Sequence, residues 1–352
     1  METAATALKH SGELVDNRAI TRARLDTLGA LECVTLTNGL IQVTVLPQIG
    51  GKMASLIRAQ SGREFLLQPP ERPYRPGSYG ARFEDYDTSG FDESLPTIAA
   101  CEYPEGRFTG VALPDHGELW SIPWQYELRD GELRLQATGR RLPYVLRKCV
   151  RLENETVVIG YELESMSESP FQYLWSAHPL LNIESGCRII LPSEVSRLLI
   201  NSSHRNRLGS PGDMCGWPIH AANGIDLSTV DSRADCTADK LFTGRLAEGW
   251  CALHYPSSDE SICLRFDPET VPHLGIWICQ GGWPSDGAGH FTVALEPCTS
   301  SHDSLVEAMT SGECELLSPR SSKRWELRIE VRQALPEEAK QVHALAYQAL
   351  VD

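Results

Sequence analysis

The feature that most limits the possible folds of this chain is an alternation of apolar and polar residues with a period of two. In "SKRWELRIEVRQ" (322–333), charged residues occupy one set of alternate positions, and the other set holds Trp325, Leu327, Ile329 and Val331. Successive side chains of a β-strand point to opposite faces of the sheet, so the pattern predicts an antiparallel strand with one solvated face. Such a strand must bury its apolar face against a second layer.

Turn signals separate further segments of the same kind. Asn38-Gly39 lies between "LECVTLT" and "LIQVTVLP", and "ENET" divides the two apolar runs of "VRLENETVVIGYELES". Asn-Gly is a strong hairpin signal, and short apolar runs bounded by turns read as strands. Many short strands with few helices predict an all-β fold, a large antiparallel β-sandwich. No low-complexity linker divides the chain, so we expect one domain over 1–352.

Helical periodicity is scarce. "PEEAKQVHALAYQAL" predicts a C-terminal helix over about 336–350, since a proline opens it and acids fill its first turn. Weaker helical patterns occur at 301–310 and at 17–28, the latter within an expected N-terminal extension of about 1–29. The segment 67–90 is rich in Pro, Gly and Tyr, which predicts an ordered loop that lines a binding site or covers a sheet edge.

Net charge limits the class of partner. The formal charge of -15, without a basic stripe, argues against nucleic acid, because phosphate binding needs clustered Lys and Arg. A neutral or cationic small molecule fits better, and a phosphorylated one would need a local arginine pocket. The sequence leaves a homodimer open.

The eleven cysteines do not form a disulfide framework. Their number is odd, they are scattered, and no pair has C-x-x-C spacing, so we expect reduced thiols and a cytoplasmic location. The N-terminus shows no signal-peptide pattern, and no apolar run is long enough to cross a membrane. Nucleotide-binding and metal-ligand spacings do not occur, so we expect no cofactor and no metal.

Three polar residues in strand-rich surroundings are candidates for chemistry. Glu296 follows the apolar run "FTVAL" and precedes a proline; on a strand it shares its face with Thr292 and Ala294, whose small side chains would leave room for a ligand. Pro297 is expected to end the strand pairing, because it has no N–H. A solvated glutamate at a strand end is the alternative reading.

Two histidines precede this glutamate. His116 stands in the turn "LPDHGELWSIPW" near Trp120 and Trp124, and aromatic platforms beside a polar turn suit the apolar faces of sugar rings. His178 lies in "YLWSAHPLLNI" at the polar end of an apolar strand. Each residue taken singly also fits a structural role.

The ordered set resembles the aldose 1-epimerase (galactose mutarotase-like) family over about residues 30–332. The resemblance rests on an initial β-meander, His116 in "DHGELW", His178 in "HPLLNI" and Glu296 in "ALEP". It implies a supersandwich fold and an isomerase that opens and closes a sugar ring. It also implies that Glu296 is the base, that His178 is the acid, and that His116 holds or polarises a sugar oxygen.

The resemblance also suggests substrate contacts. An early arginine of the family's site corresponds to Arg82, and an aspartate that contacts hydroxyls corresponds to Asp239, with Lys240 beside it as the other candidate. This chain has "PDHGE" where the galactose branch has a longer motif, so a specificity for galactose does not carry over. Trp283, in the Gly-rich segment before Glu296, and Trp120 are candidate sugar-stacking residues.

Two other functions remain open from the sequence. A glycoside hydrolase would need two carboxylates about 5–9.5 Å apart, and Asp92 or Glu93 in "GFDESLP" could partner Glu296; Asp92 is also a candidate substrate ligand. A non-catalytic carbohydrate-binding protein would use the tryptophans without Glu296 as a base. A carboxylate beside His178 is expected to raise the pKa of the imidazole above about 6.5.

Overall fold

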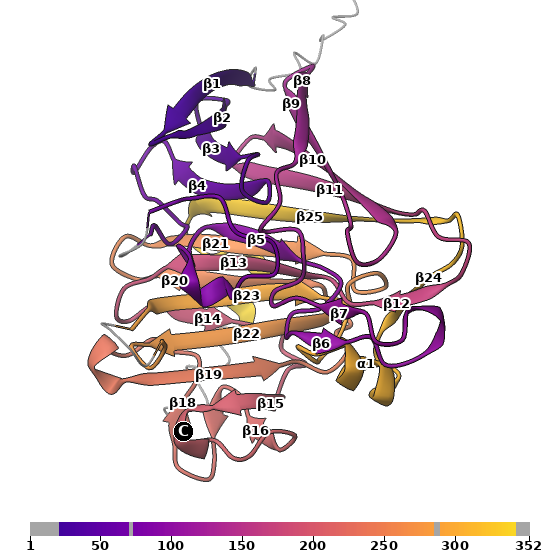
Figure 1. Cartoon of the computed structure of the whole chain (residues 1–352). Helices are drawn as coiled ribbons and strands as arrows, with labels where there is room; N and C mark the ends of the chain where they lie inside the picture. Colours follow the sequence, from indigo (N-terminus) through magenta and orange to yellow (C-terminus); the bar gives the residue numbers. More distant parts are fainter. Residues whose placement is uncertain (1–20, 70–72, 285–288, 343–352) are drawn as a thin grey trace, which may run out of the picture.

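Two large antiparallel sheets make up most of the molecule (Figure 1). The structure is a computed structural model that describes residues 21–69, 73–284 and 289–342. The prediction of a large antiparallel β-sandwich is confirmed.

The larger sheet has eleven strands, in the spatial order β1 (Arg22–Leu28), β2 (Leu31–Thr37), β3 (Ile41–Leu46), β4 (Lys52–Arg58), β5 (Phe91–Ser94), β13 (Ser176–Asn182), β23 (Phe291–Cys298), β22 (His273–Gln280), β19 (Thr237–Phe242), β15 (Arg197–Ser203) and β16 (Met214–Gly216). The smaller sheet has eight, in the order β14 (Arg188–Ile190), β20 (Trp250–Tyr255), β21 (Glu260–Phe266), β25 (Ser322–Gln333), β11 (Thr156–Ser165), β10 (Tyr144–Glu153), β9 (Glu132–Thr138) and β8 (Gln125–Arg129).

Short elements complete the described fold. Three two-stranded ribbons pair β12 (Phe171–Tyr173) with β24 (Glu315–Leu317), β17 (Ile219–His220) with β18 (Ile225–Asp226), and β6 (Cys101–Glu102) with β7 (Ala112–Leu113). The helical turns are η1 (Phe83–Asp85), η2 (Gly106–Phe108), η3 (His204–Asn206) and η4 (Arg233–Asp235), and the α-helix α1 spans Leu305–Ser311.

Several sequence predictions match these elements. The alternating segment 322–333 is β25, Asn38-Gly39 joins β2 to β3, and "ENET" joins β10 to β11. In that last turn Asn154 takes a left-handed φ of 52°, which asparagine tolerates better than most residues. The weak helical pattern at 301–310 is α1.

The helix predicted at 17–28 is wrong over its described part. Residues 22–28 form β1, which pairs with β2 along its whole length after a tight turn at Gly29, whose φ is 64°. The hydrogen bonds between β1 and β2 stabilise the strand, whereas a helix here would have no apolar surface to pack against. At the other end, residues 337–342 are helical, and the rest of the predicted 336–350 helix lies outside the described residues.

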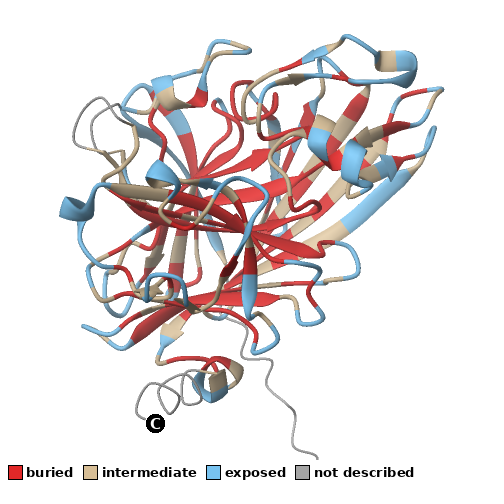
Figure 2. Ribbon diagram, turned by 90° about the horizontal axis from the view of Figure 1, so that it is seen from below, coloured by how far each residue is buried: buried red, intermediate tan, exposed pale blue. Residues whose placement is uncertain are grey.

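The core lies between the two sheets (Figure 2). Strand β5 shows how side chains are divided between the two faces of the larger sheet. Glu93 points inward, where it accepts hydrogen bonds from Lys148 Nζ on β10 (2.8 and 2.9 Å) and Tyr161 Oη on β11 (2.9 Å). Its neighbour Asp92 therefore points to the outer face.

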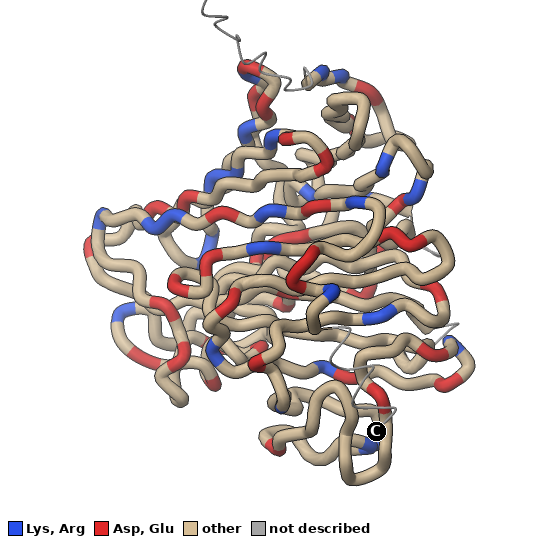
Figure 3. The backbone as a smooth tube through the Cα atoms, turned by 180° about the vertical axis from the view of Figure 1, so that it is seen from behind, with Lys and Arg blue, Asp and Glu red and all other residues tan. Residues whose placement is uncertain are grey.

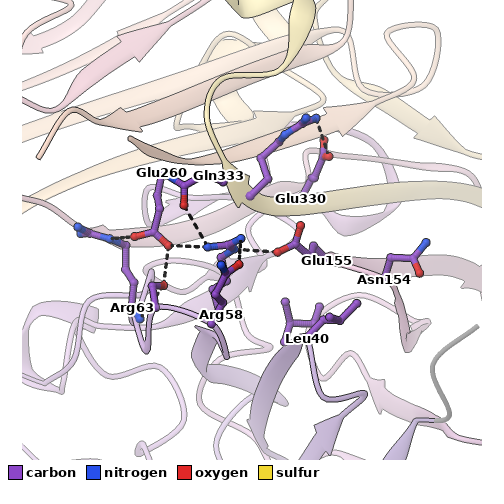
Figure 4. Close-up of polar contacts among 12 residues, drawn as sticks. Leu40, Arg58, Arg63, Asn154, Glu155, Glu260, Glu330 and Gln333 are labelled. Atoms are coloured by element: carbon purple, nitrogen blue, oxygen red, sulfur yellow. Dashed lines mark hydrogen bonds and ion pairs between the residues drawn. The ribbon is translucent and has the colours of Figure 1, made fainter. Parts of the chain in front are cut away.

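A buried ion cluster joins the sheets at one edge (Figure 4). Arg58, at the end of β4, donates to Glu155 (2.8 Å), in the β10–β11 turn, and to Glu260 (3.3 Å), at the start of β21. Arg63 donates to the same Glu260 at 2.9 Å. The cluster lies apart from the cavity described below. On the back of the molecule, basic and acidic residues are mixed (Figure 3).

A candidate active site on the outer face of the larger sheet

A cavity of about 430 Å³ opens over the outer face of the larger sheet. Strands β13, β23, β22, β19 and β15 form its floor, and segments between the strands form its walls. Its lining comprises Phe83, Thr88, Ile98, Ala99, Asp115, His116, His178, Ser202, Ser203, His204, Ala238, Lys240, Trp277, Gly282, Trp283, Glu296 and Asp303.

Strand register brings the floor residues together. Gly275 on β22 lies opposite Glu296 on β23, and the pairs on either side of His178 on β13 place it opposite Glu296 as well. A Cβ at Gly275 would lie only 3.2 Å from Glu296 Oε2, so this glycine leaves room for the carboxylate. In the next cross-strand row, Lys240 lies opposite Trp277.

Glu296 is fully buried within β23, so it is not a solvated strand end. Lys240 Nζ donates to its Oε2, and its Oε1 lies 3.9 Å from His178 Nε2. Oε1 has no hydrogen-bond partner among the described residues, which is unusual for a buried carboxylate. The prediction that Pro297 ends the pairing is wrong: Pro297 and Cys298 still lie in register with β22.

The pKa values of the two facing groups shift toward each other. Burial raises the pKa of Glu296 above its ordinary value, and the charge and hydrogen bond of Lys240 oppose this rise only in part. Burial lowers the pKa of His178 well below its ordinary value, and the nearby positive charges of His116 and Lys240 add to this effect. The expectation that Glu296 would raise the pKa of His178 is therefore wrong.

The turn that carries His116 is held at several points. His116 has a left-handed φ of 55°, and its Nδ1 lies 3.0 Å from Asp115 Oδ1. Its ring stacks on Phe83 with centroids 4.2 Å apart and lies 5.0 Å from the His178 ring. Asp115 also accepts a hydrogen bond from the Phe83 N–H (2.8 Å). Burial alone would raise the pKa of Asp115, but the hydrogen bond with His116 brings it below the usual value.

Lys240, rather than Asp239, reaches the cavity. The two are consecutive on β19, so their side chains point to opposite faces. Asp239 is fully buried, where it binds Arg207 Nε (2.9 Å), Ser203 Oγ (2.7 Å) and the His204 N–H (3.1 Å). Burial alone would lower the pKa of Lys240, but the charges of Glu296 and Asp303 raise it above the ordinary value. The ammonium is therefore charged.

Solved structures share this architecture at low sequence identity. A galactose mutarotase-like protein from Lactobacillus casei superposes with a TM-score of 0.63 at 14% identity, over 85% of this chain and 100% of its own. A Klebsiella pneumoniae protein, provisionally assigned as an aldose 1-epimerase, superposes with a TM-score of 0.67 at 14% identity. The match covers 95% of this chain and 88% of the Klebsiella protein. No family model and no curated protein sequence matches the chain.

The chain has the galactose mutarotase-like fold. A TPR-domain containing protein from Parabacteroides distasonis also superposes on it, with a TM-score of 0.59 at 12% identity, over 87% of this chain and 48% of its own. The same fold thus occurs within proteins of different descriptions, and the function of this chain has to be argued from its own residues.

Three candidate ligands lie outside the cavity of this galactose mutarotase-like fold. Arg82 is 71% exposed and pairs with Glu84. Asp92 is buried 2.8 Å from Lys52, and burial raises its pKa to about 6. Trp120 is buried beneath the cavity wall, where its Nε1 donates to the Asp115 carbonyl at 3.0 Å. The order of residues in the sequence could not show whether each of these side chains lines the cavity or lies outside it.

Other lining residues were not predicted from the sequence. Trp277 faces Trp283 edge-on, with ring centroids 5.3 Å apart, and both line the cavity. Alternation along β22 could have located Trp277, whereas Phe83 lies in the turn η1 and Asp303 lies just before α1, where no strand alternation marks one face. The small residues Thr292 and Ala294, expected to leave room for a ligand, are fully buried and do not line the cavity.

Metal-binding clusters are absent from the described part of the chain. Within it, no cluster of three or more His, Cys, Asp or Glu side chains is placed to hold a metal ion. All eleven cysteines are free thiols. Among the described helices, none is long and apolar enough to span a bilayer.

Proposed function

We propose that this protein is an isomerase of the aldose 1-epimerase type, which interconverts the anomers of a sugar. The observation that carries the proposal is Glu296, a fully buried carboxylate whose Oε1 has no hydrogen-bond partner among the described residues. Oε1 lies 3.9 Å from His178 Nε2 in a cavity walled by aromatic rings. Aromatic walls with a few convergent polar groups suit a sugar ring.

Ring opening needs one base and one acid. Glu296 takes the proton of the anomeric hydroxyl, whose oxygen becomes the aldehyde oxygen as the bond between the anomeric carbon and the ring oxygen breaks. The electron pair of that bond goes to the ring oxygen, which receives a proton from His178. Rotation of the aldehyde and closure with the roles exchanged produce the other anomer. Each proton transfer typically contributes ~10²–10⁴-fold.

The converging pKa values support this exchange of roles. A reaction that runs in both directions through the same two groups needs similar proton affinities, and burial moves Glu296 up and His178 down. Lys240 holds Oε2 of the base, so that Oε1 is the oxygen available to the sugar. Asp115 fixes the His116 ring by Nδ1, which positions it to contact a sugar oxygen.

A glycoside hydrolase built on Glu296 with Asp92 or Glu93 is less well supported. Glu93 points into the core, where Lys148 and Tyr161 occupy its oxygens. Asp92 pairs with Lys52 and does not line the cavity. Neither carboxylate can flank a glycosidic bond together with Glu296 without leaving its buried partner.

The test replaces Glu296 by glutamine. Polarimetry of a freshly dissolved α-anomer, or NMR exchange between anomers, should show that the wild-type chain accelerates mutarotation and that Glu296→Gln loses about 10²-fold or more. Saturation-transfer NMR on the same samples should show that the variant still binds the sugar. Unchanged mutarotation by Glu296→Gln would refute the catalytic assignment; binding by a wild-type chain without acceleration would indicate a carbohydrate-binding protein.

A further inference from the structure

Among the described residues, the cavity lining holds no lysine or arginine that is free to pair with a phosphate. Asp115, Glu296 and Asp303 are the carboxylates of the lining, and Lys240 is its one lysine among the described residues. Lys240 Nζ is bound to Glu296 Oε2 and lies 3.8 Å from Asp303 Oδ1, so two carboxylates already compensate its charge. His178 is neutral near pH 7, because its pKa lies well below the ordinary value.

Three arginines lie within three residues of a lining residue, and none of them lines the cavity. Arg205 is exposed, Arg207 holds Asp239 on the other side of β19, and Arg82 is exposed and paired with Glu84. No arginine lines the cavity among the described residues. Residues 285–288, which follow the Trp283 segment, carry no basic side chain in the sequence. A phosphorylated sugar would meet carboxylates and would find no bidentate guanidinium in the lining.

Asp303 offers a preorganised hydrogen-bond acceptor. Its backbone carbonyl accepts the N–H groups of Ile98 (2.9 Å) and Ala99 (2.8 Å), and Asn201 Nδ2 donates to its Oδ2 at 2.7 Å. Oδ1 is buried in the cavity lining and has no hydrogen-bond partner among the described residues. The side chain is thus anchored by one oxygen and presents the other to a ligand.

We propose that the cavity selects an uncharged aldose over a sugar phosphate, and that Asp303 Oδ1 accepts a hydroxyl of that sugar. Asp303 follows Glu296 in the chain and takes the role that sequence order suggested for Asp239, which is turned away from the cavity. The proposal rests on the proposed function for the identity of the ligand as a sugar. A buried carboxylate oxygen that accepts no hydrogen bond needs a donor, and a sugar hydroxyl supplies one.

The first experiment compares ligands by saturation-transfer difference NMR on the full chain. D-Glucose, D-galactose and D-xylose are measured beside D-glucose 6-phosphate at matched concentrations. We expect at least one free sugar to bind, with the phosphate at least about tenfold weaker. Binding of the phosphate with an affinity equal to or above that of every free sugar would overturn the proposal, as would no binding of any free sugar.

The second experiment uses Asp303→Asn. The amide oxygen would accept from Asn201, so the amide NH₂ would face the cavity and present a donor in place of an acceptor. We expect binding of the free sugar to weaken about 10- to 100-fold. Glu127→Gln, an exposed change on β8 outside the cavity, is the matched control.

These readouts separate the two proposals. Unchanged affinity in Asp303→Asn overturns the role of Asp303. The chain could bind a free sugar selectively, lose affinity in Asp303→Asn, and yet fail to accelerate mutarotation. That result would support the role of Asp303 and refute the proposed isomerase activity.

Discussion

Glu296 and His178 show how burial adjusts single residues for acid–base work. Both side chains are buried on the cavity floor, so the charged form of each is disfavoured. The same cause therefore moves a carboxyl pKa up and an imidazole pKa down. Lys240 partly opposes the rise in the pKa of Glu296 through direct contact, and its charge also disfavours the imidazolium of His178.

The pH dependence of activity follows from these directions. The rate should rise with pH as Glu296 loses its proton, above its ordinary 4.5, and fall as His178 loses its proton, below 6.5. We expect the optimum of kcat/KM for mutarotation below pH 6.5, with a decline of about tenfold per pH unit on the alkaline side. Initial rates by polarimetry from pH 4 to 9 measure it. An optimum above pH 7 would remove His178 from the role of acid.

At the scale of elements, the strands form the floor of the cavity, and a tight turn carries His116. Residues 114–118 pass directly over the end of β5: the His116 N–H donates to Ile98 O (2.6 Å) and the Glu118 N–H to Leu95 O (3.0 Å). Gly117 has a φ of 68°, and a Cβ there would lie 2.1 Å from the Leu95 carbonyl oxygen. Only glycine fits both the conformation and the space.

Gly117→Ala should therefore displace His116 from the cavity. We expect a loss of stability of about 2 kcal/mol, because strain adds to a backbone clash, and a fall in mutarotation of tenfold or more. Thermal unfolding and polarimetry measure the two effects. Gly106→Ala is the matched control: its φ is 76° but a Cβ would meet nothing within 4 Å, so it should lose about 1 kcal/mol and little activity. Equal effects of both changes would contradict the clash.

At the scale of the whole molecule, the two sheets are held together by a large apolar core and, at one edge, by the Arg58–Glu260 cluster. Arg58 belongs to the larger sheet, while Glu260 and Gln333 begin and end strands of the smaller one. Arg58 and Glu260 are both buried, so each needs an opposite charge beside it: Arg58 pairs with Glu260 and Glu155, and Glu260 pairs with Arg63 as well.

Arg58→Ala should destabilise the fold by about 3 kcal/mol or more, because it leaves Glu260 buried with only Arg63 as a cationic partner. Urea unfolding gives the free energy, and the activity of the folded fraction should not change. The control is Arg147→Ala, which removes a surface pair with Glu164 (2.7 Å) and should lose less than about 1 kcal/mol. A loss for Arg58→Ala no larger than that control would show that the cluster does not hold the sheets.

Several residues that the sequence analysis singled out lie together in the fold. Glu296, His178 and His116, named from the family resemblance, line one cavity with the candidate ligands Lys240 and Trp283. Arg82, Asp92, Trp120 and Asp239 do not line it, because contact depends on which way a loop or strand residue turns after folding. Asp303 was missed because the helical pattern at 301–310 gives no sign of a cavity and because its neighbours, Ile98 and Asn201, are distant in sequence.

The sequence by itself determined the strands and the two faces of each, because alternation is a local property that burial imposes on neighbouring residues. It also determined the hairpin turns at Asn38-Gly39 and Asn154, where local chemistry sets the backbone. Only the tertiary structure decided that β13, β23, β22 and β19 are neighbours, and hence that Lys240 meets Glu296 and that His178 faces it. Sheet order and register arise from long-range pairing and packing, which no local pattern records.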